Sequence, residues 1–234
     1  LDSGLLSRLS HHGIVELTEI QQKSIPLLRE GKDLVGQSET GSGKTLAFGI
    51  PAMEKVVQGG GVQVLILTPT RELALQLQKE FVKFSYRPMH AACVYGGVGI
   101  EPQIHALQRS EIVVATPGRL MDHMQRGTVK LRGVKILVID EADKMFDMGF
   151  IDDIERIIRA IPTERQTMLF SATIPDRIAM LSRRYMRNPV RVSAGKQVSS
   201  HLLKQIYYDV MDNEKFSLLV HLLKKLDPER AMVF

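Results

Sequence analysis

A glycine-rich segment near the beginning of the chain has the residue types that bind a triphosphate. Residues 38–45 read Ser-Glu-Thr-Gly-Ser-Gly-Lys-Thr and follow a short apolar run. Small residues let backbone N–H groups curl around phosphate oxygens, Lys44 can reach the β and γ phosphates, and the Thr45 hydroxyl can bind Mg²⁺. The segment could be only a turn, and Ser38 replaces the glycine of the strict pattern. The residues that we assign to the nucleotide in this loop are Thr40, Gly41, Ser42, Gly43, Lys44 and Thr45.

Two adjacent carboxylates follow another apolar run farther along the chain. Residues 136–143 read Ile-Leu-Val-Ile-Asp-Glu-Ala-Asp. Asp140 is placed to hold a metal ion through water, and Glu141 to orient or deprotonate an attacking water. Alone, the pair could be a solvated strand end. Together with the glycine-rich loop it predicts nucleotide hydrolysis, with Lys44, Asp140 and Glu141 as the catalytic residues. Thr45 and Asp140 are the predicted ligands of Mg²⁺.

Composition narrows the class of protein. At 234 residues, 44% of them hydrophobic, the chain can bury one core and part of a second. Its net charge of +5 permits a polyanionic partner without proving one. A single cysteine, Cys93, excludes an internal disulfide or a cysteine-rich zinc site, and its apolar neighbours indicate a buried structural thiol. Tryptophan is absent and aromatic residues make up 6%, which argues against a platform for base stacking.

The ends and the hydropathy of the chain bear on its location. No apolar stretch approaches the ~18 residues of a membrane span, and the sequence has no signal peptide. The chain begins at Leu1 rather than at methionine. We therefore expect a cytoplasmic protein that has been trimmed at its N-terminus.

The elements that would position these residues follow from the hydrophobic pattern. Short, almost wholly apolar runs recur at 34–35, 64–67, 112–115, 136–139 and 168–170. Runs without alternation indicate strands buried on both faces, as in a parallel sheet covered by helices. Two intervening segments carry apolar residues at helical spacing, namely Leu73, Leu77, Phe81 and Phe84, and Ile151, Ile154, Ile158 and Ile161. The alternation predicts an α/β domain with a doubly wound, mostly parallel sheet up to residue 194, and such sheets bind ligands at the carboxyl ends of their strands.

The last part of the chain differs from the rest. Residues 195–204 are polar and read as a linker. A strand-like run at 205–211, an amphipathic helix and a final apolar run at 231–234 follow. The helix is marked by Phe216, Leu219, Leu223 and Leu226. We predict that residues 205–234 are the start of a second α/β unit that stops in mid-strand.

Six short motifs occur in a fixed order along the chain. They lie at residues 40–45, 69–74, 96–97, 116–119, 140–143 and 171–173. This set closely resembles the N-terminal RecA-like domain of DEAD-box RNA helicases, from about residue 13 to the end of the chain. The resemblance implies a RecA-like P-loop NTPase domain at 1–194, followed by the truncated start of a second RecA-like domain.

The resemblance extends to the recognition of adenine. Residues 13–21 are similar to the segment that reads the base in this family, so Gln21 would pair with the adenine edge and Ile14 would cover the ring. The family usually has an aromatic residue where Ile14 stands, and proline where Leu17 stands. Taken without the other motifs, Gln21 could be an exposed helix residue.

Further motifs imply contacts with RNA and communication with the nucleotide. In the family two segments and a glycine pair approach the sugar-phosphate backbone, and no base edge is read. The corresponding residues are Pro69, Thr70, Arg71, Gly97, Thr116, Pro117, Gly118 and Arg119. Threonine and proline at these places also suit helix caps, and both roles can hold together. Ser171 and Thr173 would bond to Asp143 and couple the nucleotide site to RNA, although a cap after a strand is the simpler alternative.

The resemblance implies an ATP-dependent RNA helicase with ATP and Mg²⁺ as cofactors. RNA and the absent second RecA-like domain would be its partners, with ATP bound between the two domains, so that closure clamps RNA and separates short duplexes. One alternative is a non-processive, ATP-gated RNA clamp or assembly platform with little unwinding. Another, a DNA-directed or transport ATPase, is disfavoured by the segments at 69–73 and 116–119.

Overall fold

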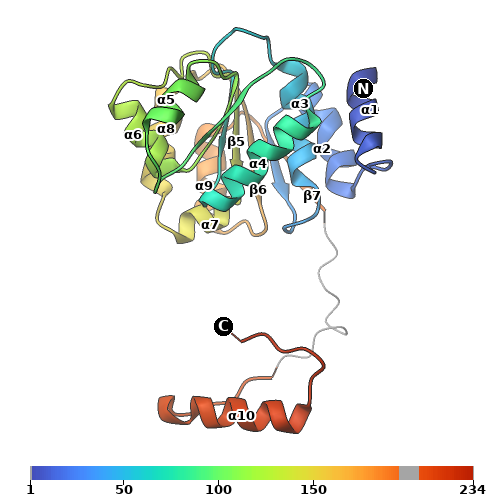
Figure 1. Cartoon of the computed structure of the whole chain (residues 1–234), viewed down its shortest axis with the longest axis vertical. Coiled ribbons are helices and arrows are strands. Elements are labelled where there is room, and N and C mark those ends of the chain that lie inside the picture. Colours follow the sequence, from blue (N-terminus) through green and yellow to red (C-terminus); the bar gives the residue numbers. More distant parts are fainter. Residues whose placement is uncertain (1, 195–205, 234) are drawn as a thin grey trace. The chain divides into compact units, whose positions relative to one another are not determined.

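A parallel sheet of seven strands forms the centre of the first unit of the computed structural model (Figure 1). The structure describes residues 2–194 and 206–233 and divides the chain into Leu1–Gly195 and Lys196–Phe234. The strands of the sheet are β1 (Leu34–Gln37), β2 (Val64–Leu67), β3 (Ala91–Val94), β4 (Ile112–Ala115), β5 (Ile136–Asp140), β6 (Gln166–Ser171) and β7 (Val190–Ser193). Their order is β3-β4-β2-β5-β6-β1-β7, so β5, β6 and β1 are neighbours, and so are β3, β4 and β2.

The five apolar runs of the sequence are all strands, as predicted. Every residue of β2, β4, β5 and β6 is buried, because helices cover both faces of these central strands. The edge strands β3 and β7 alternate between buried and more exposed residues. Cys93 lies in β3, half-buried and without a disulfide, and burial raises the pKa of its thiol to about 11. A neutral thiol in a strand agrees with the structural role predicted for it.

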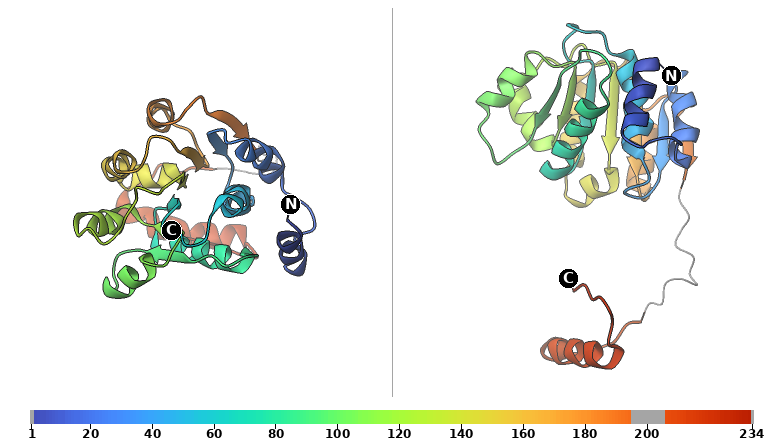
Figure 2. Two further views of the ribbon diagram at one scale, coloured as in Figure 1. Left: turned by 90° about the horizontal axis from the view of Figure 1, so that it is seen from above. Right: turned by 45° about the vertical axis from the view of Figure 1, so that its right-hand side comes forward.

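Helices lie on both sides of the sheet (Figure 2). The helices of this unit are α1 (Ser3–His11), α2 (Glu19–Arg29), α3 (Lys44–Lys55), α4 (Arg71–Phe84), α5 (Glu101–Leu107), α6 (Pro117–Gln125), α7 (Ala142–Asp147), α8 (Ile151–Ala160) and α9 (Asp176–Tyr185). Side chains of α1 to α4 pack with Val64 and Ile66 in one core, and those of α5 to α9 pack with Leu65 and Leu67 in another. Successive residues of one strand thus face opposite layers, which is the predicted doubly wound arrangement.

The two helical patterns of the sequence correspond to α4 and α8. In α4, Leu77, Phe81 and Phe84 are buried in the first core. Ile154 and Ile158 of α8 are buried in the second core. The apolar faces of α4 and α8 therefore pack into different cores.

The described part of the second unit, residues 206–233, contains one α-helix, and one prediction for it was wrong. Helix α10 (Lys215–Leu226) follows a 3₁₀ turn, η1 (Asp212–Glu214), and includes the predicted amphipathic segment. The described residues 206–211 and 231–233 form no strand. An extended segment is stable only beside another strand, and no described part of this unit provides one. The predicted linker at 195–204, and the predicted strand residues Gln205 and Phe234, lie outside the described residues.

Within residues 2–194 and 206–233, no helix combines the length and the hydropathy that crossing a membrane requires.

Candidate nucleotide and RNA sites

A cavity of about 540 Å³ lies where β1 and β5 end, at the carboxyl edge of the sheet. Nearly all the residues predicted to serve the nucleotide line it together: Ile14, Gln21, Thr40, Gly41, Gly43, Lys44, Thr45, Asp140 and Glu141. Ser42 is not among the lining residues. Side chains of α4 form another part of the wall and were not among the predicted site residues: Leu73, Gln76, Leu77, Glu80, Lys83 and Phe84. All of them except Leu73 lie outside the six motifs.

The glycine-rich loop depends on two glycines with backbone angles that other residues rarely adopt. Gly41 has a φ of 83° and Gly43 a φ of 93°. A Cβ on Gly43 would also lie 2.5 Å from the Nε2 atom of Gln21 and 2.8 Å from the Oγ1 atom of Thr18. Helix α3 begins at the next residue, Lys44, so its positive end faces the loop. The local geometry is that of an anion-binding turn.

Gln21 is tied to this loop, a contact that its place in the sequence did not reveal. Its Nε2 donates to the carbonyl oxygen of Gly43 at 2.9 Å, and its Oε1 accepts from the backbone N–H of Thr18 at 3.0 Å. The second bond belongs to a capping box at the start of α2, which the spacing of Thr18 and Gln21 could have indicated. The amide keeps one N–H and one lone pair free of these bonds. Pairing with adenine therefore stays a prediction.

Lys44 and Asp140 are buried beside the cavity, with exposed fractions of 7% and 6%. The Nζ atom of Lys44 donates to the carbonyl oxygen of Ser38 at 3.2 Å. Burial raises the pKa of Asp140 to about 6. The positive charge of Lys44 opposes this shift, and the negative charge of Glu141 adds to it. A cation beside Asp140 would favour its ionised form.

Glu141 is held between the glycine-rich loop and α7. It adopts a left-handed backbone conformation with a φ of 53°, which is uncommon for a residue with a side chain. Its Oε1 accepts from the Thr40 hydroxyl at 3.3 Å, and its Oε2 lies 2.8 Å from the Nζ atom of Lys144. The neighbouring positive charge of Lys144 was not foreseen. The Lys144 side chain is 55% exposed and that of Glu141 only 5%, so solvent reaches the pair from the lysine side.

The oxygen donors at this edge fit a Mg²⁺ ion that arrives with a nucleotide. Thr45 and Asp140 line the same cavity and offer one hydroxyl and one carboxylate. The described residues contain no group of three or more His, Cys, Asp and Glu side chains suited to a metal. Mg²⁺ commonly uses one or two protein oxygens and completes its shell with phosphates and water. This donor set therefore fits a nucleotide-bound ion.

The acidic motif is hydrogen-bonded to the end of β6. The Oδ2 atom of Asp143 accepts from the backbone N–H and from the hydroxyl of Thr173, each at 3.0 Å. The N–H of Asp143 in turn donates to the Oγ atom of Ser171 at 3.1 Å. These are the contacts that the resemblance implied. They join the segments that follow the neighbouring strands β5 and β6.

The segments expected to bind RNA follow β2, β3 and β4, which are neighbours at the other side of the sheet. Thr70 caps α4, because its hydroxyl accepts from the N–H of Leu73 at 3.3 Å. Thr116 makes no such side-chain cap, whereas Pro117 begins α6. The N-termini of α4 and α6 thus lie at one edge of the sheet, where backbone N–H groups suit phosphate oxygens.

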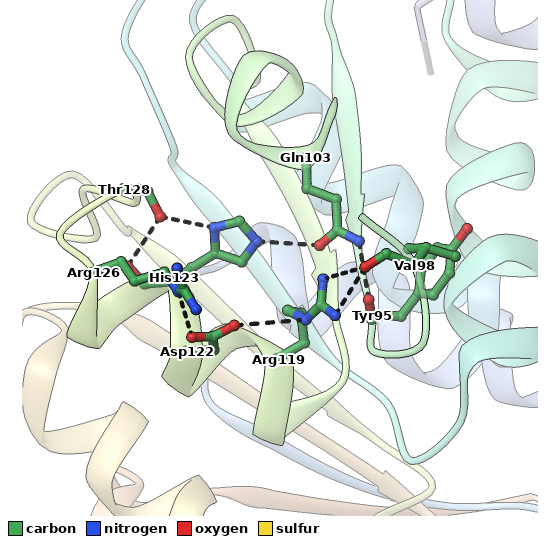
Figure 3. A network of polar contacts seen from close by, with 8 residues as sticks. All are labelled: Tyr95, Val98, Gln103, Arg119, Asp122, His123, Arg126 and Thr128. Carbon is green, nitrogen blue, oxygen red and sulfur yellow. Dashed lines mark hydrogen bonds and ion pairs between the residues drawn. The ribbon is translucent and has the colours of Figure 1, made fainter. Parts of the chain in front are cut away.

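The two arginines of these segments both contact the loop after β3, and Figure 3 shows the contact of Arg119. The terminal nitrogens of Arg119 donate to the carbonyl oxygen of Val98, each at 3.0 Å, and its side chain is only 15% exposed. The guanidinium of Arg71, an exposed residue, lies 5.1 Å from the ring centre of Tyr95. Gly97, between these contacts, has a φ of 83°. Arg119 is therefore largely engaged within the protein, while Arg71 keeps its hydrogen-bond donors for a ligand.

The comparisons with known proteins agree with this arrangement. The family model described as "DEAD/DEAH box helicase" matches residues 18–181. The chain is 48% identical to an ATP-dependent RNA helicase CshA from Listeria monocytogenes and 45% identical to a DEAD-box ATP-dependent RNA helicase CshA from Geobacillus kaustophilus. Each match covers the whole of this chain and 46% or 51% of the relative, so the chain spans about half the length of these proteins.

A solved structure has the same fold as the first unit. A DEAD box protein from Methanococcus jannaschii matches with a TM-score of 0.82 and 42% identity over 96% of this chain and 61% of the other. The predicted RecA-like fold is thereby confirmed. By its family match, its sequence identity and its fold, the chain belongs to the DEAD/DEAH box helicase family.

Proposed function

We propose that the chain is the first RecA-like domain of an ATP-dependent RNA helicase, with the beginning of the second. The first domain would occupy residues 1–194, the linker 195–204 and the second domain 205 onward. One observation carries the proposal. The residues predicted to bind the nucleotide and those predicted to bind RNA follow strands of one parallel sheet, and so they lie at the same edge of it. Asp143 and Thr173, which are hydrogen-bonded to each other, follow the neighbouring strands β5 and β6.

The residues around the cavity suit the hydrolysis of ATP. Backbone N–H groups of the glycine-rich loop and the ammonium of Lys44 would hold the phosphates, while Ile14 and Gln21 would face adenine. Thr45 and Asp140 would hold Mg²⁺, which when bound neutralises negative charge on the phosphates. Glu141 would orient the attacking water and accept its proton.

The RNA side suits a reader of phosphate rather than of bases. Thr70, Thr116 and the backbone at Gly97 and Gly118 would contact the sugar-phosphate chain, with Arg71 supplying positive charge. A Cβ at Gly97 or Gly118 would meet no atom within 4 Å, so a strand can approach the backbone closely there. Binding would therefore be insensitive to RNA sequence.

Catalysis would need the second domain. The relatives are about twice as long as this chain, and a two-domain site requires charge from its other wall to stabilise the transferring phosphoryl group. A cytoplasmic location, clamping of RNA and local unwinding belong to the same proposal for the whole protein.

The test compares the 234-residue chain with the longer protein of which it would be part. We expect RNA-stimulated ATP hydrolysis and duplex separation by the longer protein and almost none by the chain alone. Single-stranded DNA of the same sequence is the control and should stimulate hydrolysis far less. Equal stimulation by DNA, or comparable unwinding by the chain alone, would contradict the proposal.

A further inference from the structure

A row of buried polar groups leads from α6 to the loop between β3 and α5 (Figure 3). The ring of His123, which is 0% exposed, lies with its Nδ1 2.8 Å from the Thr128 hydroxyl and its Nε2 3.1 Å from the Oε1 of Gln103. Gln103, 6% exposed, donates from Nε2 to the carbonyl oxygen of Tyr95 at 2.9 Å. No sequence motif indicated this row, because its members come from separate elements.

The chemistry of these groups fixes the direction of each hydrogen bond. The carbonyl of Tyr95 can only accept, so the NH₂ group of Gln103 must face it and the Oε1 must face His123. His123 therefore carries a proton on Nε2 and donates it to Gln103. Its Nδ1 then accepts the single proton of the Thr128 hydroxyl. The backbone carbonyl of His123 also lies 3.1 Å from that hydroxyl, but it already accepts from the N–H of Thr128 at 3.0 Å. Both nitrogens of a buried imidazole are satisfied, as burial requires.

The neutral form of the ring suits this assignment. Burial lowers the pKa of His123, and the charges of Arg119 and Arg126 lower it further, against an opposing effect of Asp122. These three charged residues lie on its own helix or directly after it. Gln103, its partner on α5, is neutral.

Two carbonyl groups of the loop that this row reaches are held by side chains of α5 and α6. Its first carbonyl, on Tyr95, is held by Gln103, and the carbonyl of Val98 is held by Arg119. Gly96 and Gly97 lie between these two points, and a Cβ on either would meet nothing within 4 Å. Their backbone is therefore open to a ligand. Its conformation is restrained by the hydrogen bonds to the carbonyl groups on either side, those of Tyr95 and Val98.

We propose that His123 is a positioning residue for RNA binding. It fixes the amide of Gln103, which fixes the carbonyl of Tyr95 and so presents the backbone of Gly96 and Gly97 to an RNA phosphate. This role rests on the proposed function, in which that loop contacts RNA. It adds a pair of buried residues, His123 and Gln103, that touch no RNA themselves.

The test is a nuclear magnetic resonance titration of the 234-residue chain with a ten-uridine RNA. The amide signals of Gly97 and Gly118 report RNA at the two segments, and the side-chain ¹⁵N signals of His123 report its tautomer. We expect both glycine signals to move on addition of RNA, and His123 to carry its proton on Nε2. ATP affinity is measured beside each titration.

Four variants separate a positioning role from a merely structural one. His123→Leu and Gln103→Leu should each weaken RNA binding about three- to tenfold, the effect of losing one hydrogen bond, and the double variant should lose no more than either. His123→Gln retains an N–H donor in place of Nε2 and should restore binding to within about twofold of the unsubstituted chain. ATP affinity should be unchanged in all of them.

The matched control is Ser110→Ala. Ser110 is buried and follows the C-terminal end of α5, the end away from the loop, and its hydroxyl donates to the carbonyl oxygen of Ala106. The substitution removes this hydrogen bond and should leave RNA binding unchanged. If the chain itself shows no RNA-dependent shift at Gly97 or Gly118, the proposed function fails and the positioning role fails with it. Normal RNA binding by both leucine variants would overturn the positioning role alone. Should His123→Leu not fold, Gln103→Leu and His123→Gln decide the question by the same criteria.

Discussion

One carboxylate oxygen of Asp143 accepts two hydrogen bonds from Thr173, one from its backbone N–H and one from its hydroxyl, each 3.0 Å long. Asp143 lies in α7, close in sequence to Asp140 and Glu141, and Thr173 follows β6. A movement of α7 would therefore strain or break its hydrogen bonds to the segment after β6. This contact links the segment after β5 to the segment after β6.

We predict that Thr173→Val uncouples ATP hydrolysis from RNA in the longer protein. Valine keeps the shape and the backbone N–H but loses the hydroxyl donor to Asp143. RNA stimulation of ATP hydrolysis should fall, while ATP affinity and hydrolysis without RNA stay the same. Thr163→Val, in the exposed segment before β6, is the control. Full RNA stimulation in Thr173→Val would rule out the coupling role.

The charge of Asp143 should make part of the stability depend on pH. Burial raises its pKa, but hydrogen bonds from Thr173 and Ser171 outweigh this, and the net shift is downward from 3.8. Since the folded pKa is the lower one, the contribution is present above pH 3.8 and is lost as the pH falls through the folded pKa. Urea unfolding of the chain and of Asp143→Asn should show a difference in unfolding free energy that shrinks on acidification. A difference independent of pH would contradict this.

Lys44→Ala should weaken ATP binding. The buried ammonium has one hydrogen bond within the protein, to Ser38, and its loss removes a charge-assisted contact worth about 1.5–3 kcal/mol. Calorimetric titration with ATP measures the change directly. Lys32→Ala, which removes an exposed lysine paired with Glu30, is the control for net charge. Equal affinities in the chain and in Lys44→Ala would refute the assignment of the phosphate loop.

Glu141→Gln should leave ATP binding intact and abolish turnover in the longer protein. The amide can still accept a hydrogen bond from the Thr40 hydroxyl, but it cannot take a proton from water. Single-turnover hydrolysis and nucleotide affinity are measured on the same preparation. Glu164→Gln removes an exposed carboxylate and controls for the lost charge. Appreciable turnover in Glu141→Gln would exclude it as the base.

Arg71→Ala should weaken RNA binding equally for unrelated sequences and reduce the salt dependence by about one ion. Arg119→Ala should weaken binding too, but with a smaller change in salt dependence, since its guanidinium is bonded to the carbonyl of Val98. Fluorescence anisotropy over a range of salt concentrations separates these effects. Arg156→Ala, on the exposed side of α8, is the control. An effect of Arg71→Ala on one RNA sequence alone would mean that bases are read.

Much of the first unit could be predicted from local patterns. The apolar runs became strands because a segment without polar residues is stable only when both faces are covered, and the carboxyl ends of parallel strands necessarily meet at one edge. The loop at 38–45 was predictable because glycine, lysine and threonine in this order form a short local motif that is typical of phosphate binding. The run at 206–211 was not predictable in the same way, because a strand needs a partner that the described residues of its unit do not supply.

The sequence by itself determined which functional groups the chain offers, such as the ammonium of Lys44 and the carboxylates of Asp140 and Glu141. Only the tertiary structure decided which of the other side chains are free and which are already engaged. Gln21 is bonded to Gly43, Arg119 to Val98, and His123 to Gln103. These partners come from separate elements, and a hydrogen bond depends on distances of a fraction of an ångström that no sequence spacing contains.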